Sequence, residues 1–185
     1  MNEIQKTRTV DAYLAQLDAQ REAMVIALDG LTAEQLWQRP APGEWSIAEI
    51  LNHTDILIRS TSPLVRFAWR WFRWTYHLLK NQPIRKEMED PYRKPSFPHW
   101  FSFPWKPKFS PQNPAPLAML LDQIRITHQE VRDFYQGKDQ QVLGHVYLFD
   151  PLFGFFNLIL ALRIGLYHDQ LHYEDVIKLA AELKQ

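Results

Sequence analysis

The sequence contains no cysteine among its 185 residues. Disulfide bonds and thiolate ligands are therefore excluded, and a metal site would have to use histidine, carboxylate or water ligands. The formal net charge is also zero, because 21 lysine and arginine residues balance 21 aspartate and glutamate residues. A chain without net charge lacks the general positive field that attracts nucleic acids, so we expect no nucleic-acid partner.

Long apolar runs are absent as well. The longest, at residues 153–162, is interrupted by Asn157 and followed by Arg163, which makes it too short to span a bilayer. The first residues are polar and mixed in charge, without the apolar core that a secretory signal needs. We therefore expect a cytoplasmic protein with no membrane span, whose length suits a single domain over residues 1–185.

Apolar residues recur at spacings of three and four, which predicts a largely helical chain. Long helices are expected over about residues 9–30, from Asn113-Pro114 to about residue 136, and from Asp150-Pro151 to about residue 183. A short helix is expected at residues 32–38. Strand-like alternation does not persist anywhere and no repeat is visible, so the fold class is predicted to be an all-α helical bundle.

The helix that follows Pro42 and Gly43 has the best-marked start in the sequence. Ser46 is the expected N-cap and Glu49 completes a capping box. Such a start sets the direction of a helix firmly, which suits a site that needs precise placement. Ser62-Pro63 has the pattern of another helix start and predicts a separate helix over residues 64–79.

Two histidines stand out in the last helix. His168 and His172 are four residues apart, so both imidazoles leave the same face of the helix. They belong to an apolar stripe, in which the small residues Ala161 and Gly165 would leave space beside the rings. His53 shares a three-and-four spacing with Ile50 and Leu57, and so also points inward.

Three inward histidines from two helices can meet in a bundle core. Zinc and nickel accept neutral imidazole, and catalytic sites commonly keep three protein ligands and an open position. The alternative is that each ring is a hydrogen-bonded core residue, which is the commoner role of a single buried histidine. The spacing leaves both interpretations open.

Residues 81–113 change in composition, with seven prolines interleaved with aromatic residues. Regular helix is not expected there, because proline removes donors and fixes φ, and so many aromatic residues argue against disorder. We expect an irregular, ordered flap.

Three roles for the tryptophans are open: packing on the bundle or lining a pocket mouth, a dimer interface, or docking on a membrane surface together with Arg66, Arg70 and Arg73. The residues in question are Trp69, Trp71, Trp74, Trp100 and Trp105. Stacking on single-stranded nucleic acid is disfavoured by the zero net charge.

The segment "LWQRPAPGEWSIAEILNHTDILI" resembles the signature of the DinB-like (DinB/YfiT) four-helix-bundle superfamily. The matching residues, in order and spacing, are Trp37, Pro42, Gly43, Trp45, Ser46 and His53. The family's last helix carries two further metal ligands in an HxxxH pattern, which His168 and His172 match. "FDPLFG" at residues 149–154 is similar to the family's entry to that helix. The match omits roughly residues 63–115, which form an aromatic and proline-rich insert foreign to the family pattern.

This resemblance implies an up-down-down-up bundle, often dimeric, that holds a divalent metal, usually nickel, zinc or iron, on His53, His168 and His172. It implies a hydrolase or a thiol S-transferase acting on a small molecule, with a low-molecular-weight thiol as the partner in the second case. The alternative is a non-catalytic metal- or ligand-binding module of the stress response. In either enzyme, the metal would lower the pKa of a bound water or thiol.

No general base or organic cofactor is indicated by the sequence. Asp55 and Asp169 are expected to point away from the histidine stripe. For five other residues a surface or packing role is favoured over one at the site: His77, His99, His128, His145 and Tyr147. Glu130 is expected to face water.

Overall fold

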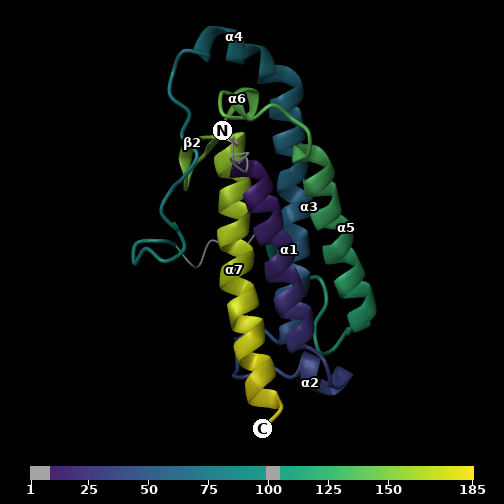
Figure 1. Ribbon diagram of the computed structural model, residues 1–185. Helices are drawn as coiled ribbons and strands as arrows, with labels where there is room; N and C mark the ends of the chain where they lie inside the picture. The colour runs from purple at the N-terminus through teal and green to yellow at the C-terminus, as the bar shows by residue number, and fades with distance from the viewer. Residues whose placement is uncertain (1–8, 99–104) are drawn as a thin grey trace, which may run out of the picture.

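The computed structural model describes residues 9–98 and 105–185. Four long helices lie side by side (Figure 1): α1 (Thr9–Ala27), α3 (Ile47–Phe72), α5 (Leu117–Tyr135) and α7 (Leu158–Leu183). The links contain α2 (Ala33–Trp37), a 3-10 turn (Arg73–Thr75), α4 (Tyr76–Leu79) and α6 (Gln140–Leu143), and an antiparallel hairpin of β1 (Tyr147–Asp150) and β2 (Gly154–Asn157). The predicted helical bundle is confirmed. No helix in these two described stretches is long and apolar enough to cross a membrane.

Helix direction decides which residues can meet. In Figure 1, α1 and α7 run toward the end of the bundle that holds α2 and the C-terminus, while α3 and α5 run toward the end that holds α4. Helix α7 packs on both α1 and α3, and α3 also packs on α5. An early turn of α3 thereby lies beside the middle of the antiparallel α7.

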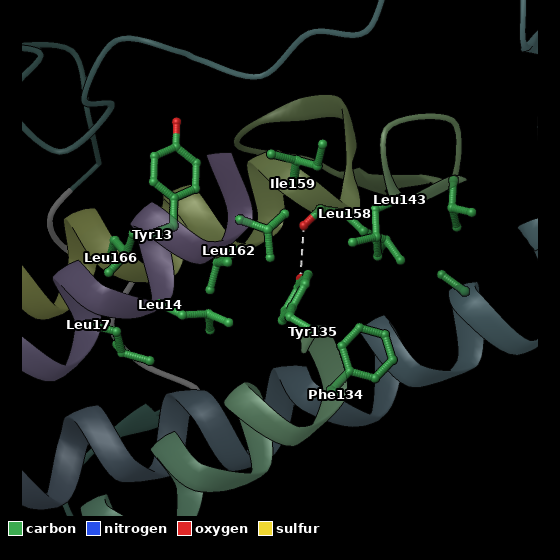
Figure 2. Packing of buried hydrophobic residues seen from close by; sticks show 13 residues of the cluster. Tyr13, Leu14, Leu17, Phe134, Tyr135, Leu143, Leu158, Ile159, Leu162 and Leu166 are labelled. Carbon is green, nitrogen blue, oxygen red and sulfur yellow. Dashed lines mark hydrogen bonds between the residues drawn. The ribbon is translucent and has the colours of Figure 1, made fainter. Parts of the chain in front are cut away.

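Two apolar clusters form the core. The first joins α1, α5 and α7, and within it the Tyr135 hydroxyl donates to the Leu158 carbonyl at 2.8 Å (Figure 2). The second joins the other half of the bundle and includes Met24, Ile47 and Tyr173. Polar side chains from three helices are also buried: Asn52, His53, Thr54, Asp55, Thr127, His128, His168 and Asp169. Buried polar groups need partners, so a buried polar set of this kind indicates a candidate functional site.

The start of α3 agrees with its sequence. The Ser46 hydroxyl accepts from the Glu49 backbone N–H, and the Glu49 carboxylate accepts from the Ser46 N–H. Arg39 donates to both oxygens of that carboxylate. A capping box also forms at Thr32 and Gln35. Satisfied amides at the start of α3 hold His53, two turns further on, in a defined position.

The predicted helix break at Pro63 is wrong, because α3 continues through it to Phe72. Proline removes one donor to the preceding turn. In that turn the Thr61 hydroxyl donates to the Leu57 carbonyl at 2.9 Å, and the Ser60 hydroxyl donates to the same oxygen. Beyond the proline, Ala68 is buried in the first core cluster. The bond lost at the proline is the one to the Arg59 carbonyl, which these hydroxyls do not replace, so tertiary packing is what keeps α3 continuous.

The last helix begins later than predicted, at Leu158 instead of Asp150-Pro151. Asp150 caps a turn instead, since its carboxylate accepts from the backbone N–H groups of Leu152 and Phe153. The chain then forms the β1–β2 hairpin, which corrects the expectation of no strands. Asn157 is the true N-cap of α7, and its side chain accepts from Leu160.

Helix α5 also starts a few residues late, with Pro116 as its N-cap. The segment before it, residues 83–98, has no helix or strand. Polar contacts attach the irregular chain to the bundle. The Tyr13 hydroxyl donates to the Lys86 carbonyl, the Tyr167 hydroxyl donates to the Met88 carbonyl, and the Lys108 N–H donates to Asn52.

Candidate metal centre

The three histidines singled out by spacing lie together in the structure. Helix α3 supplies His53, and α7 supplies His168 and His172. One nitrogen of each ring lies within 4.8 Å of the others. The Nε2 atoms of His53 and His168 are 3.2 Å apart, and the His172 ring centroid is 4.8 Å from that of His53 and 4.5 Å from that of His168.

A backbone carbonyl sets the tautomer of His53. Its Nδ1 lies 2.7 Å from the Trp105 carbonyl oxygen, which can only accept, so Nδ1 carries the proton. Nε2 then carries no proton, and its lone pair, which can bind a cation, lies on the side of His168. The Trp45 ring packs against the imidazole at a centroid distance of 4.8 Å. Sequence reasoning missed the Trp105 contact because a backbone acceptor leaves no signal in side-chain patterns.

A buried carboxylate stands behind His168. Asp169 Oδ2 is 3.1 Å from His128 Nε2, and Asp169 Oδ1 is 3.6 Å from His168 Nδ1. Burial alone would raise the pKa of Asp169, but the hydrogen bond from His128 and the nearby His168 lower it to about 2. Asp169 is therefore ionised, and an acceptor of this kind orients an imidazole ring.

The predicted direction of Asp169 is wrong. The fully buried side of α7 passes through Leu166, Asp169, Tyr173 and Val176, so Asp169 belongs to the core face. The stripe that contains Ala161, Gly165, His168 and His172 instead lines a pocket. Asp55 is also buried, and it pairs with Arg59. His128 could have been found, because it continues the buried stripe of Leu120 and Ile124 on α5.

The three rings have the chemistry of a divalent-cation site. Burial, with smaller effects of the neighbouring rings, lowers the pKa of His53 to about 4 and that of His172 to about 2. Both are neutral near pH 7, as metal ligands must be. Two nitrogens held about 2.1 Å from a tetrahedral ion are about 3.4 Å apart, close to the 3.2 Å between His53 and His168. The donor set therefore has the chemistry of a zinc-like site, with the spacing of two bound ligands at His53 and His168 and all three nitrogens within 4.8 Å.

A pocket of about 360 Å³ opens onto the histidines. Ala161 and Gly165 line it, as their small size predicted. Tyr92 and Trp105 contribute from the irregular segment, and the hairpin region contributes apolar side chains, among them Leu148, Phe149, Leu152, Phe153 and Phe156. Its volume is in the range of small-molecule sites. Among the described residues, no lysine or arginine lines it.

Comparison with known proteins identifies the family. A family model described as the DinB superfamily matches residues 16–176. The chain belongs to the DinB superfamily. This confirms the resemblance seen in the motif around Trp45 and His53. A search of curated proteins found no match.

A solved structure shares the DinB fold of this chain. YfiT from Bacillus subtilis matches with a TM-score of 0.63 and 13% sequence identity, covering 100% of this chain and 92% of that chain. YfiT is described as a probable metal-dependent hydrolase with an unusual four-helix bundle topology. At this identity the similarity establishes the four-helix-bundle fold.

None of the remaining polar candidates of this DinB protein is among the described residues that line the 360 Å³ pocket. His145 is buried, and its ring nitrogens lie 2.7 Å from the Gln141 carbonyl and 3.1 Å from the Gln82 carbonyl, so it ties the irregular segment to α6. His77 and Glu130 are exposed, and Tyr147 is partly exposed. His99 and Trp100 lie outside the described residues. The packing role predicted for His145 is confirmed by its burial, whereas the buried His128 contacts Asp169 behind His168.

Replacing Gly165 by alanine is expected to stabilise the DinB bundle by about 0.5–1 kcal/mol, because glycine is costly inside a helix. A Cβ built there meets no atom within 4 Å. Gly144→Ala is the matched control, since its Cβ would collide with the Ile84 side chain, and a loss of about 1–3 kcal/mol is expected. Urea unfolding of both variants measures the difference. A destabilised Gly165→Ala variant would contradict the open space assigned to this position.

The metal-free DinB protein is expected to lose stability as the pH falls below 6.5, the ordinary histidine pKa. The unfolded chain binds protons at His53 and His172 near that pH, whereas the folded chain resists until about pH 4 for His53 and about pH 2 for His172. Stability is complete above this window, and each histidine removes about 1.4 kcal/mol per pH unit within it. Urea unfolding with a chelator present, from about pH 7 to about pH 5, measures the slope. His172→Ala should reduce the slope, and an equal slope in that variant would refute the assignment.

Proposed function

We propose that this protein is a divalent-metal-dependent hydrolase whose metal is held by His53, His168 and His172. The observation that carries the proposal is the meeting of three imidazoles from two helices at an apolar pocket. Zinc, nickel and iron all accept such ligands. The description of YfiT as a probable metal-dependent hydrolase agrees with this function. The helix directions support the up-down-down-up connection as part of the same proposal.

The protein's own groups have separable roles in this function. The Trp105 carbonyl and the Asp169 carboxylate orient the His53 and His168 rings. The aromatic walls exclude water and bind the apolar part of a substrate. A divalent cation held by the three nitrogens would supply the Lewis acidity that brings the pKa of bound water toward neutrality.

The lining of the pocket indicates the substrate class. The described lining residues include no lysine or arginine that could pair with an anionic group of a substrate. Asp150 is the one carboxylate among the described lining residues, and it accepts from the backbone N–H groups of Leu152 and Phe153. Apart from the proposed cation, the described lining therefore offers no partner to a charged substituent, which would lose hydration in the apolar part of the pocket. We infer a small, neutral, largely apolar ester or amide.

Metal reconstitution followed by substrate screening tests the proposal. Purified protein is stripped with a chelator, loaded with zinc, nickel or iron, and assayed with neutral aryl esters and amides and with their carboxylate-bearing analogues. The expected result is stoichiometric metal, thiol-independent hydrolysis and preference for the neutral compounds. Turnover only with an added low-molecular-weight thiol would favour the S-transferase alternative, and stoichiometric metal without turnover would favour the binding module. Failure to bind any of the three metals would refute the site.

A further inference from the structure

The second half of α3 and the turn into α4 expose a stripe of apolar side chains. Leu64, Phe67, Trp71, Trp74 and Leu78 are 60%, 54%, 57%, 57% and 73% exposed. Leu64, Phe67 and Trp71 recur at spacings of three and four, so they share one side of α3, and Trp74 and Leu78 follow in the 3-10 turn and α4. Another side carries Ala68 and Trp69, which pack on the first core cluster. Of the roles considered for the tryptophans, packing therefore holds for Trp69 but is wrong for Trp71 and Trp74.

Basic residues accompany this stripe. No acidic residue occurs between Asp55 and Glu87, while seven basic residues do: Arg59, Arg66, Arg70, Arg73, Lys80, Arg85 and Lys86. Arg70, Arg73 and Lys80 are exposed and form no ion pair with any described residue. We call Leu64, Phe67, Arg70, Trp71, Arg73, Trp74 and Leu78 the aromatic–basic surface. Its charge is local, because the chain as a whole is neutral.

The composition of this surface identifies its partner. In a symmetric dimer the same patch would face itself, which would bring Arg70 and Arg73 of two copies together without an acidic residue of the patch to balance them. An anionic lipid surface supplies the opposite charge and an apolar layer for the rings. Tryptophan is suited to the headgroup region, since its ring is apolar and its N–H polar.

We propose that the aromatic–basic surface docks the protein on an anionic phospholipid bilayer. The apolar stripe enters the headgroup boundary, and Arg70 and Arg73 contact lipid phosphates. The surface lies toward the end of the bundle that holds α4 (Figure 1). Leu64, at its start, also lines the 360 Å³ pocket together with Phe149 of the hairpin. Docking would therefore place the pocket beside the lipid surface.

Vesicle flotation tests this docking directly. Purified full-length protein is mixed with phosphatidylcholine vesicles that contain or lack phosphatidylglycerol, at low salt and at about 0.15 M ionic strength. We expect binding to the anionic vesicles only, weakened by salt. The pairs Arg70→Glu with Arg73→Glu, and Trp71→Ser with Trp74→Ser, should each lower the partition coefficient at least about tenfold.

Control variants distinguish this surface from the general effect of losing an exposed apolar side chain or reversing an exposed charge. Ile26→Ser on α1 removes another apolar side chain that is 66% exposed, and Arg125→Glu on α5 reverses a charge that is 62% exposed. Both should bind vesicles like the unaltered protein, as should His53→Ala, since docking does not depend on the metal. Circular dichroism checks that each variant is folded.

Three results would overturn the docking proposal. The first is equal binding to neutral and anionic vesicles, or none to either. The second is undiminished binding by the folded charge-reversed pair. The third is a dimer in sedimentation velocity that the tryptophan pair abolishes, without vesicle binding, which would identify a second copy of the chain as the partner.

Discussion

His53→Ala is expected to lower the affinity for zinc by more than about 100-fold. This exceeds the loss of affinity that is usual when a residue hydrogen-bonded to a metal ligand is replaced. The substitution removes the only proposed ligand from α3 and leaves two nitrogens from one helix. The Trp105 carbonyl also loses its donor, which costs about 1–3 kcal/mol of stability. Competition with a chromophoric chelator measures the affinity, and circular dichroism measures the retained helix.

Two further variants make this prediction decisive. His77→Ala removes an exposed histidine on α4 and should leave zinc binding unchanged. His172→Ala removes a proposed ligand whose ring is only partly buried, so we expect a smaller effect on folding and a comparable loss of zinc affinity. If both His53→Ala and His172→Ala still bind zinc like the unaltered protein, the three rings are core residues and the metal proposal fails.

Asp169→Asn is expected to lower metal affinity by about 10- to 100-fold, because the carboxylate orients His168 and increases its basicity as a ligand. The buried His128 would also lose its charged partner at 3.1 Å, at a cost of about 1–3 kcal/mol in the free energy of unfolding. Cobalt substitution gives a readout specific to the site, since its visible spectrum reports ligand geometry. A changed spectrum at saturating cobalt distinguishes a positioning role from simple destabilisation.

Asp175→Asn is the matched control for this experiment. Asp175 is also an aspartate of α7, but its side chain is exposed. It should change neither cobalt spectrum nor zinc affinity. His128→Gln tests the next contact outward and should weaken metal binding less than Asp169→Asn. Unaltered affinity and spectrum in Asp169→Asn would show that the 3.6 Å contact with His168 does not position the ring.

Local rules predicted the elements that hold the site. The capping box at Ser46 and Glu49 marked the start of α3 correctly, and the spacing of His168 and His172 placed both rings on one face of α7. The small residues Ala161 and Gly165 indicated space beside them, and both line the pocket. These are interactions within a few residues, for which helix geometry alone determines the neighbours.

The wrong predictions arose where a local sequence pattern was overridden by contacts with residues distant in the sequence. Ser62-Pro63 has the pattern of a helix start, but packing of Ala68 keeps α3 continuous. Asp150-Pro151 has the same pattern, but the pairing of β1 with β2 delays α7 to Leu158. Asp169 was placed on the wrong side because α7 has two inward faces, one toward the core and one toward the pocket.

The sequence by itself determined that the chain is helical, that α3 begins at a firm cap, and that two histidines share a turn of α7. Only the tertiary structure decided that His53 and His168, 115 residues apart in sequence, approach within 3.2 Å. It also decided that the Trp105 carbonyl and Asp169 stand behind the rings, and that Trp71 and Trp74 face outward. The reason is physical: hydrogen bonds within a helix follow from neighbouring residues, whereas contacts between helices depend on how all their faces pack together.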